Sequence, residues 1–150
     1  MKHENIASHV GGMRWQIFID GLNLMTHVGL HDHEFGQLQA VELNIEMSYR
    51  INDQPNHKND ADGMIDYDKY CIRLSEFMLN KPHTRLLEIL TSEVASLSFS
   101  EYPMLEEIKV AIHKPKIREN AARLGVAASW TRWSYETMLL QQPVESLLSI

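Results

Sequence analysis

The sequence is poor in cysteine, with Cys71 alone among 150 residues. An intrachain disulfide is therefore impossible, and no cysteine cluster is available to hold a metal. Long apolar runs are also missing, since none approaches the roughly 20 residues that cross a bilayer. Residues 1–13 lack the apolar segment of a secretory signal. We therefore expect a cytoplasmic protein with no membrane partner.

Basic charge is scarce as well. Lysine and arginine number 14 against 20 acidic residues, which gives a formal net charge of -6. Because phosphate backbones bind basic surfaces, this balance argues against nucleic acid as a partner. The sequence contains neither a Gly-x-Ser-x-Gly nucleophile motif nor a glycine-rich phosphate loop. Its 44% hydrophobic and 23% charged residues are typical of one globular domain.

Alternation of apolar and polar residues predicts four strands. The clearest is Val41–Tyr49, whose period of two is typical of a strand buried on one face. Trp15–Met25 is its expected hairpin partner, with a bulge near Asp20-Gly21. Ile108–Ile112 and Leu124–Trp130 alternate in the same way and predict a second pair of strands.

Two helical patterns separate these strand pairs. Apolar residues recur every three or four positions over Tyr67–Met78, and Asp66 is placed to cap the start. Lys81-Pro82-His83 ends this helix, and a second apolar stripe follows over residues 84–97. The order ββααββ predicts an α+β fold, with a four-stranded antiparallel sheet and two helices on one face. Pairing of its open edges with neighbouring subunits would close a barrel.

The chain divides by these patterns into three parts. Residues 1–13 form an N-terminal extension, residues 14–134 the domain, and residues 135–150 a C-terminal tail that we expect to be partly helical.

Three residues at the ends of elements are candidates for chemistry. Lys114 ends a strand before Pro115 and can point into a cleft, although a solvated loop lysine is the alternative. Glu88 lies in the first turn of the second helix among apolar neighbours, which suggests partial burial. Its carboxylate could accept two parallel donors from a heterocycle, or merely complement the helix dipole. Tyr67 starts the first helix and could equally be a tyrosine at the core edge.

The loop His31-Asp32-His33-Glu34 raises the question of a metal. Two histidines beside two acids could bind zinc, with His27 or His113 as a third ligand. No second cluster has metal-type spacing, however, and histidine-rich loops are often simply exposed. We therefore predict no metal, and expect Glu34 to anchor the substrate or a catalytic lysine instead.

The order of these motifs resembles the dihydroneopterin aldolase family over about Ile17 to Arg132. Glu34 follows Gly29 by five residues, and Gln39 follows Glu34 by five, as in the family. The remaining segments that carry the resemblance are Ile65-Asp66-Tyr67, Leu86-Leu87-Glu88, His113-Lys114-Pro115 and Leu124-Gly125-Val126.

This resemblance implies the tunnelling fold (T-fold), in which subunits form tetrameric rings, often stacked as octamers, with active sites between subunits. It also implies a lyase of folate biosynthesis that cleaves 7,8-dihydroneopterin into 6-hydroxymethyl-7,8-dihydropterin and glycolaldehyde. The ring imine of the pterin accepts the electrons, so neither a metal, a Schiff base nor a cofactor is required.

The resemblance also implies a role for each candidate residue. Glu88, with backbone groups near Leu87, holds the amino-pyrimidinone edge of the pterin. Lys114 is the general acid and base, acting through an ordered water. Tyr67, donated by the adjacent subunit, helps deliver a proton to the new hydroxymethyl group. Glu34 positions Lys114 or the hydroxyl groups of the substrate.

Three alternatives remain open. Dihydroneopterin triphosphate 2′-epimerase shares the fold and the enamine intermediate, but must accommodate a triphosphate. A zinc-dependent pterin synthase of the same fold would use His31 and His33. A non-catalytic pterin-binding ring would bind the pterin without releasing glycolaldehyde.

Overall fold

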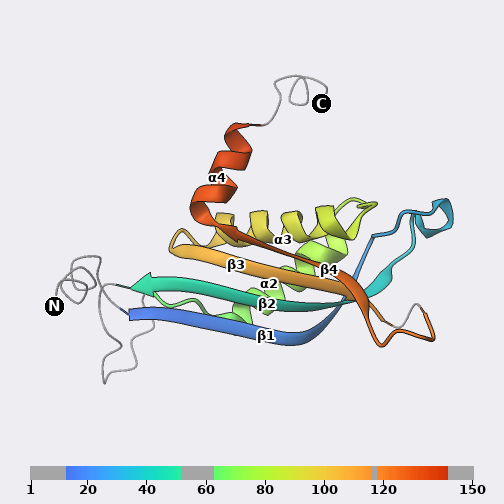
Figure 1. Ribbon diagram of the computed structural model, residues 1–150, viewed down its shortest axis with the longest axis horizontal. Helices are drawn as coiled ribbons and strands as arrows, with labels where there is room; N and C mark the ends of the chain where they lie inside the picture. Colours follow the sequence, from blue (N-terminus) through green and yellow to red (C-terminus); the bar gives the residue numbers. More distant parts are fainter. Residues whose placement is uncertain (1–12, 52–62, 116–117, 142–150) are drawn as a thin grey trace.

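Four strands form one antiparallel sheet in the computed structural model, which describes residues 13–51, 63–115 and 118–141. Helices α2 and α3 connect β2 to β3 and cover one face of the sheet (Figure 1). This confirms the predicted ββααββ order. The strands, in their order across the sheet, are β1 (Met13–Thr26), β2 (Gln39–Ile51), β3 (Leu105–Lys114) and β4 (Leu124–Thr131). The helical elements are η1 (Asp32–Glu34), α2 (Tyr67–Asn80), α3 (Leu87–Glu101) and α4 (Arg132–Leu140).

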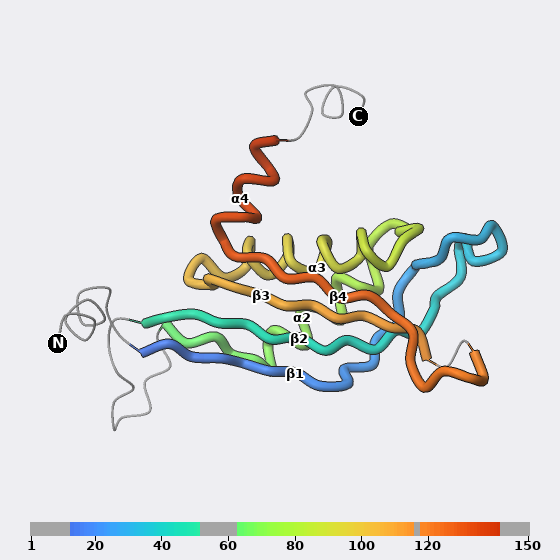
Figure 2. The backbone as a smooth tube through the Cα atoms, viewed as in Figure 1, coloured from blue at the N-terminus to red at the C-terminus, as the bar shows by residue number. Residues whose placement is uncertain are grey.

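The predicted bulge in β1 is confirmed. The register of β1 against β2 shifts between Ile19 and Leu22. Gly21 has φ +69°, a conformation that residues with a Cβ adopt at a cost. Its N–H donates to Asn44 Oδ1 at 2.8 Å, which satisfies a group that the bulge removes from the ladder. Both strands continue side by side beyond this point (Figure 2).

Local signals fix the bounds of α2. The Asp66 carboxylate accepts hydrogen bonds from the N–H groups of Asp68 and Lys69, at 3.0 and 3.2 Å, and caps the helix as predicted. The helix stops at Asn80 because Lys81 precedes Pro82 and takes an extended conformation, with ψ 155°.

The start of α3 differs from the prediction. The apolar stripe predicted a helix from near Thr84, but α3 begins at Leu87. Thr84 instead forms an isolated parallel bridge with Val28, so its backbone pairs with the segment that follows β1 and not with the helix. A tertiary contact therefore displaces the helix start.

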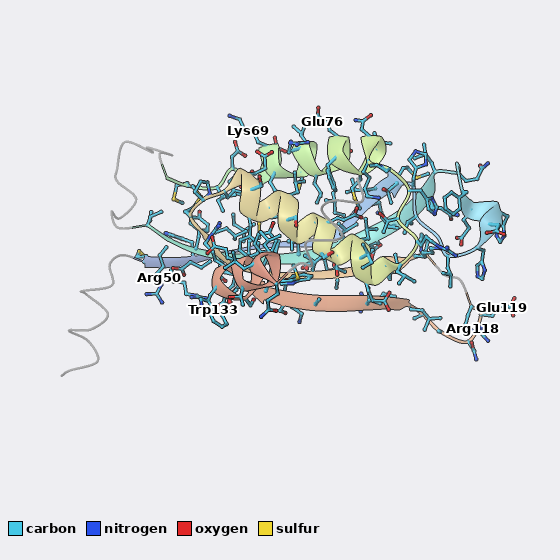
Figure 3. The ribbon with its side chains drawn as sticks, turned by 90° about the horizontal axis from the view of Figure 1, so that it is seen from above. Arg50, Lys69, Glu76, Arg118, Glu119 and Trp133 are labelled. Atoms are coloured by element: carbon cyan, nitrogen blue, oxygen red, sulfur yellow. The ribbon has the colours of Figure 1, made fainter. Side chains whose placement is uncertain are left out.

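The core lies between the sheet and the two helices. α2 packs on β1, and α3 packs on β3 and β4 (Figure 3). Each fully buried Val, Leu or Ile contributes about 1.5–3 kcal/mol to stability. On β2 the buried positions are those that the alternation predicted: Val41, Leu43, Ile45, Met47 and Tyr49. Their polar neighbours, such as Asn44 and Glu46, face the side of the sheet that carries no helix.

β1 and β4 are the edges of the sheet within the described residues. α4 follows β4 directly and projects from the sheet (Figure 1). Its start is capped by Thr131, whose hydroxyl accepts from the Ser134 N–H at 3.0 Å. None of the described helices is long and apolar enough to cross a membrane.

Candidate active site

Three segments meet at one end of the sheet and line a cavity of about 310 Å³. They are the segment after β1, the start of α3, and the adjoining ends of β3 and β4, which Figure 2 shows at the same end. A cavity of this size suits a small molecule. Its lining includes Val28, Gly29, Leu30, His31, Glu34, Arg85, Leu86, Leu87, Glu88, Lys114, Leu124, Gly125 and Val126.

Glu34 and Lys114 form an ion pair inside this cavity, although 80 residues separate them in the chain. Lys114 Nζ donates to Glu34 Oε2 at 2.6 Å. The Glu34 side chain is 8% exposed and that of Lys114 is 19% exposed. This confinement strengthens the pair, because little water screens it. Lys114 is the last residue of β3, as the sequence predicted.

Further donors hold Glu34 in place. The His31 N–H donates to Oε1 at 3.0 Å, and Gln39 Nε2 donates to Oε2 at 3.1 Å. A Cβ on Gly29 would lie 2.3 Å from Cδ of Glu34, so only glycine leaves room for this side chain. Gly29 also has φ +150°, which disfavours other residues.

These contacts set the charge of Glu34. The hydrogen bond from Lys114 lowers the pKa of Glu34 below its usual 4.5, and the His31 N–H acts in the same direction. Burial opposes this shift but does not overcome it. Glu34 is therefore a carboxylate at neutral pH, and it accepts hydrogen bonds on both oxygens.

Leu87 and Glu88, at the start of α3, also line the cavity. The cap residue Leu86 provides no side-chain hydrogen bond, so N–H groups of the first turn are available to a ligand. Glu88 is exposed in this chain, which corrects the partial burial expected from its apolar neighbours. Those neighbours face in several directions around the helix, and they do not enclose the carboxylate.

Tyr67 is not brought to this cavity within one chain. It is 65% exposed at the start of α2, close to the Ile65 N–H that donates to Tyr49 Oη. Tyr49 lies ten residues along β2 from Gln39, a span of roughly 33 Å in a strand, so Tyr67 lies toward the other end of the sheet from the ion pair.

The four candidate metal-binding histidines do not converge. Among the residues that the structure describes, no three His, Cys, Asp or Glu side chains are grouped to hold a metal ion. His31 and His33 are exposed and stack with ring centroids 5.7 Å apart. His113 instead pairs with Glu42, with Nε2 3.0 Å from Oε2.

Two residues near the cavity were missed by the sequence interpretation. Arg85 lines the cavity, and its guanidinium donates to the Leu30 carbonyl at 3.2 Å. Lys81 is buried, and its Nζ lies 3.5 Å from the carbonyl of His27, which precedes the lining residue Val28. The Lys-Pro pair indicates only the end of a helix in the sequence. No periodic pattern predicts that the lysine side chain will bind backbone and hydroxyl groups of the residues that follow it.

The chain is similar to known dihydroneopterin aldolases in sequence. The family model described as FolB, dihydroneopterin aldolase, matches residues 17–129. A dihydroneopterin aldolase of Haemophilus influenzae is 27% identical over 111 residues, which are 74% of this chain and 92% of that protein.

Two solved structures have the same fold. Escherichia coli dihydroneopterin aldolase in complex with neopterin matches with a TM-score of 0.68 and 22% identity, over 77% of this chain and 98% of that one. A dihydroneopterin aldolase of Burkholderia bound to guanine matches with a TM-score of 0.63 and 14% identity, over 79% and 92%.

Proposed function

Because the chain belongs to the dihydroneopterin aldolase family, we propose that it cleaves 7,8-dihydroneopterin into 6-hydroxymethyl-7,8-dihydropterin and glycolaldehyde, without a metal or a Schiff base. One observation carries this proposal. The Glu34–Lys114 pair lines the same cavity as Leu87 and Glu88, which supports a site where a heterocycle binds at the start of α3 beside a group that can move protons.

Glu88 and the first turn of α3 bind the pterin ring. The amino-pyrimidinone edge carries two parallel N–H donors, which match the two oxygens of a carboxylate. Its carbonyl accepts from backbone N–H groups near Leu87, which no side-chain cap occupies. The neopterin and guanine of the two structural relatives both carry this edge.

Lys114 moves the protons through a bound water. The water passes the proton of the 2′-hydroxyl on to the neutral amine of Lys114, which becomes the ammonium, while the C1′–C2′ bond breaks and glycolaldehyde leaves. The bonding electrons enter the ring imine and form an enamine. A proton returned to C1′ then gives the hydroxymethyl product. Glu34 holds the Lys114 ammonium in place, and its second oxygen stays fixed by the His31 N–H.

Tyr67 reaches the cavity from a second copy of the chain, because it lies at the far end of its own subunit. The edge strands β1 and β4 can pair between copies, which would close a ring of four subunits. Two such rings could then stack to form an octamer. Mixing the inactive variants Tyr67→Phe and Lys114→Ala should restore part of the activity, because some mixed interfaces carry both native residues. No restoration after subunit exchange, verified by mass spectrometry, would contradict the shared site.

The deciding experiment uses purified protein treated with a chelator. Incubation with 7,8-dihydroneopterin should yield 6-hydroxymethyl-7,8-dihydropterin and glycolaldehyde in equal amounts, which chromatography of the products would measure. Folded protein that gives no cleavage would reject the aldolase. Cleavage restored only by added zinc would reject the metal-free mechanism.

A further inference from the structure

Lys81 is a buried lysine that the proposed chemistry does not use. Its side chain is 2% exposed, and it directly follows α2. Burial lowers the pKa of Lys81, and the nearby Glu93 carboxylate opposes this shift from 3.5 Å. A charged group in such a place destabilises the fold unless hydrogen bonds satisfy it. Its partners therefore indicate what it holds.

The Lys81 ammonium binds oxygens from three segments. Nζ donates to the Pro82 carbonyl at 2.7 Å and to Thr84 Oγ1 at 2.6 Å in the α2–α3 connection, and lies 3.5 Å both from the His27 carbonyl after β1 and from Glu93 Oε1 in α3. The Thr84 hydroxyl donates to Glu93 Oε1 at 2.5 Å. A hydroxyl has one proton, so Thr84 accepts from Lys81 and donates to Glu93. This relay ties the α2–α3 connection to α3 itself.

The same connection binds the segment after β1 through a set of contacts that we call the clasp, between residues 81–85 and residues 27–30. Apart from the lysine, its bonds are Thr84 N–H to His27 O at 3.0 Å, Gly29 N–H to Thr84 O at 3.0 Å, His83 Nε2 to Gly29 O at 2.8 Å, and Arg85 Nη2 to Leu30 O at 3.2 Å.

The clasp joins the two walls of the cavity. Val28, Gly29 and Leu30 form one wall, and Leu86, Leu87 and Glu88 follow the clasp residues directly in the other. Gly29 also lies against the Glu34 side chain, with no room for a Cβ between them. A shift of the clasp would therefore move Glu34 relative to Glu88.

We propose that Lys81 is a positioning residue, whose ammonium fixes the clasp and thereby the spacing between the Glu34–Lys114 pair and the pterin-binding start of α3. This inference rests on the proposed aldolase function where it is tested by kinetics. Its test by hydrogen exchange does not depend on that function.

The kinetic test uses Lys81→Met, which keeps the length of the side chain and removes its charge. Well below the melting temperature, the KM for 7,8-dihydroneopterin should rise about tenfold, because displaced walls bind the substrate poorly. Thr84→Val, which keeps the shape but not the hydroxyl, should raise KM in the same direction. Thr84→Ser keeps the hydroxyl and should restore KM to within about twofold of the wild type.

The matched control is Ser98→Ala. It removes a buried hydrogen bond of 2.7 Å to Tyr70 between α2 and α3, away from the cavity. It should lower the melting temperature but leave KM unchanged, which is the result expected of a merely structural role. A Lys81→Met enzyme with the wild-type KM would overturn the inference.

Hydrogen exchange provides the readout that needs no activity. The amides of Gly29 and Thr84 should exchange faster in Lys81→Met than in Ser98→Ala, because both belong to the clasp. Unchanged exchange at both amides would overturn the inference, whatever the kinetics. An inactive wild type would instead reject the aldolase, and the exchange result would still decide the role of Lys81.

Discussion

At the end of the sheet that carries the cavity, Lys114 and Glu34 meet with side chains that are 19% and 8% exposed. At the opposite end, Arg14 and Glu107 meet at 2.9 Å with 41% and 50% exposed. Water and salt screen the second pair, so it contributes about 0–1 kcal/mol. The first pair is largely removed from water, and loss of one partner leaves the other charge without compensation.

The two ion pairs therefore differ in how firmly the fold fixes the charged side chains. An exposed ion pair can move without consequence, whereas Glu34 is fixed by three donors and by Gly29. Lys81 belongs to the same end and is fixed in a similar way. Changes at the cavity end should thus affect activity and pH dependence, whereas loss of the exposed Arg14–Glu107 pair should lower only the stability, and only slightly.

The largest effect should come from Lys114→Ala. Removal of the proton carrier should lower kcat by about 10²–10⁴-fold, while pterin binding is retained. The control is Lys109→Ala, an exposed lysine on the same strand, which should keep kcat. Stopped-flow assays and pterin fluorescence titrations measure the two quantities. A Lys114→Ala enzyme with kcat within tenfold of the wild type would remove Lys114 from the mechanism.

Glu88→Ala should act on binding instead. Loss of two charge-assisted hydrogen bonds should weaken pterin affinity by about 100-fold, which calorimetry would measure. Glu76→Ala, on the outer side of α2 in Figure 3, removes an equivalent charge far from the cavity. Full affinity in Glu88→Ala would show that the carboxylate does not anchor the ring.

Glu34→Gln should change how stability depends on pH. The pKa of Glu34 is lowered by the Lys114 hydrogen bond, so its stabilising contribution is present above pH 4.5 and is lost as the pH falls through the folded-state pKa. The difference in unfolding free energy between wild type and variant should therefore shrink as the pH falls below 4.5 and through the lowered pKa of Glu34. Denaturant titrations measure this, with the exposed Glu46→Gln as control. A constant difference would contradict the lowered pKa.

Arg14→Ala should have the smallest effect. It removes ion pairs with Glu106 and Glu107, all of them exposed, and should cost less than about 1 kcal/mol. The cost should fall further in 1 M salt, because ions screen the pair. A loss above 2 kcal/mol would mean that the far end of the sheet also depends on a fixed charge.

Much of the fold could be predicted because local rules govern it. Alternation along β2, the Asp66 cap and the bulge at Gly21 each depend on residues close in sequence or on a fixed period. Glu88 shows the limit of such rules. Its apolar neighbours suggested burial, but a helix turns its residues 100° apart, so neighbours in sequence face different directions.

The sequence by itself determined the order of strands and helices, their approximate ends and the positions of Lys114 and Glu88 at the ends of elements. Only the tertiary structure brought Glu34 to Lys114 across 80 residues, and only it buried Lys81 and moved the start of α3 past Thr84. Backbone periodicity acts within a few residues, whereas the environment of a charge depends on which distant segments exclude water from it.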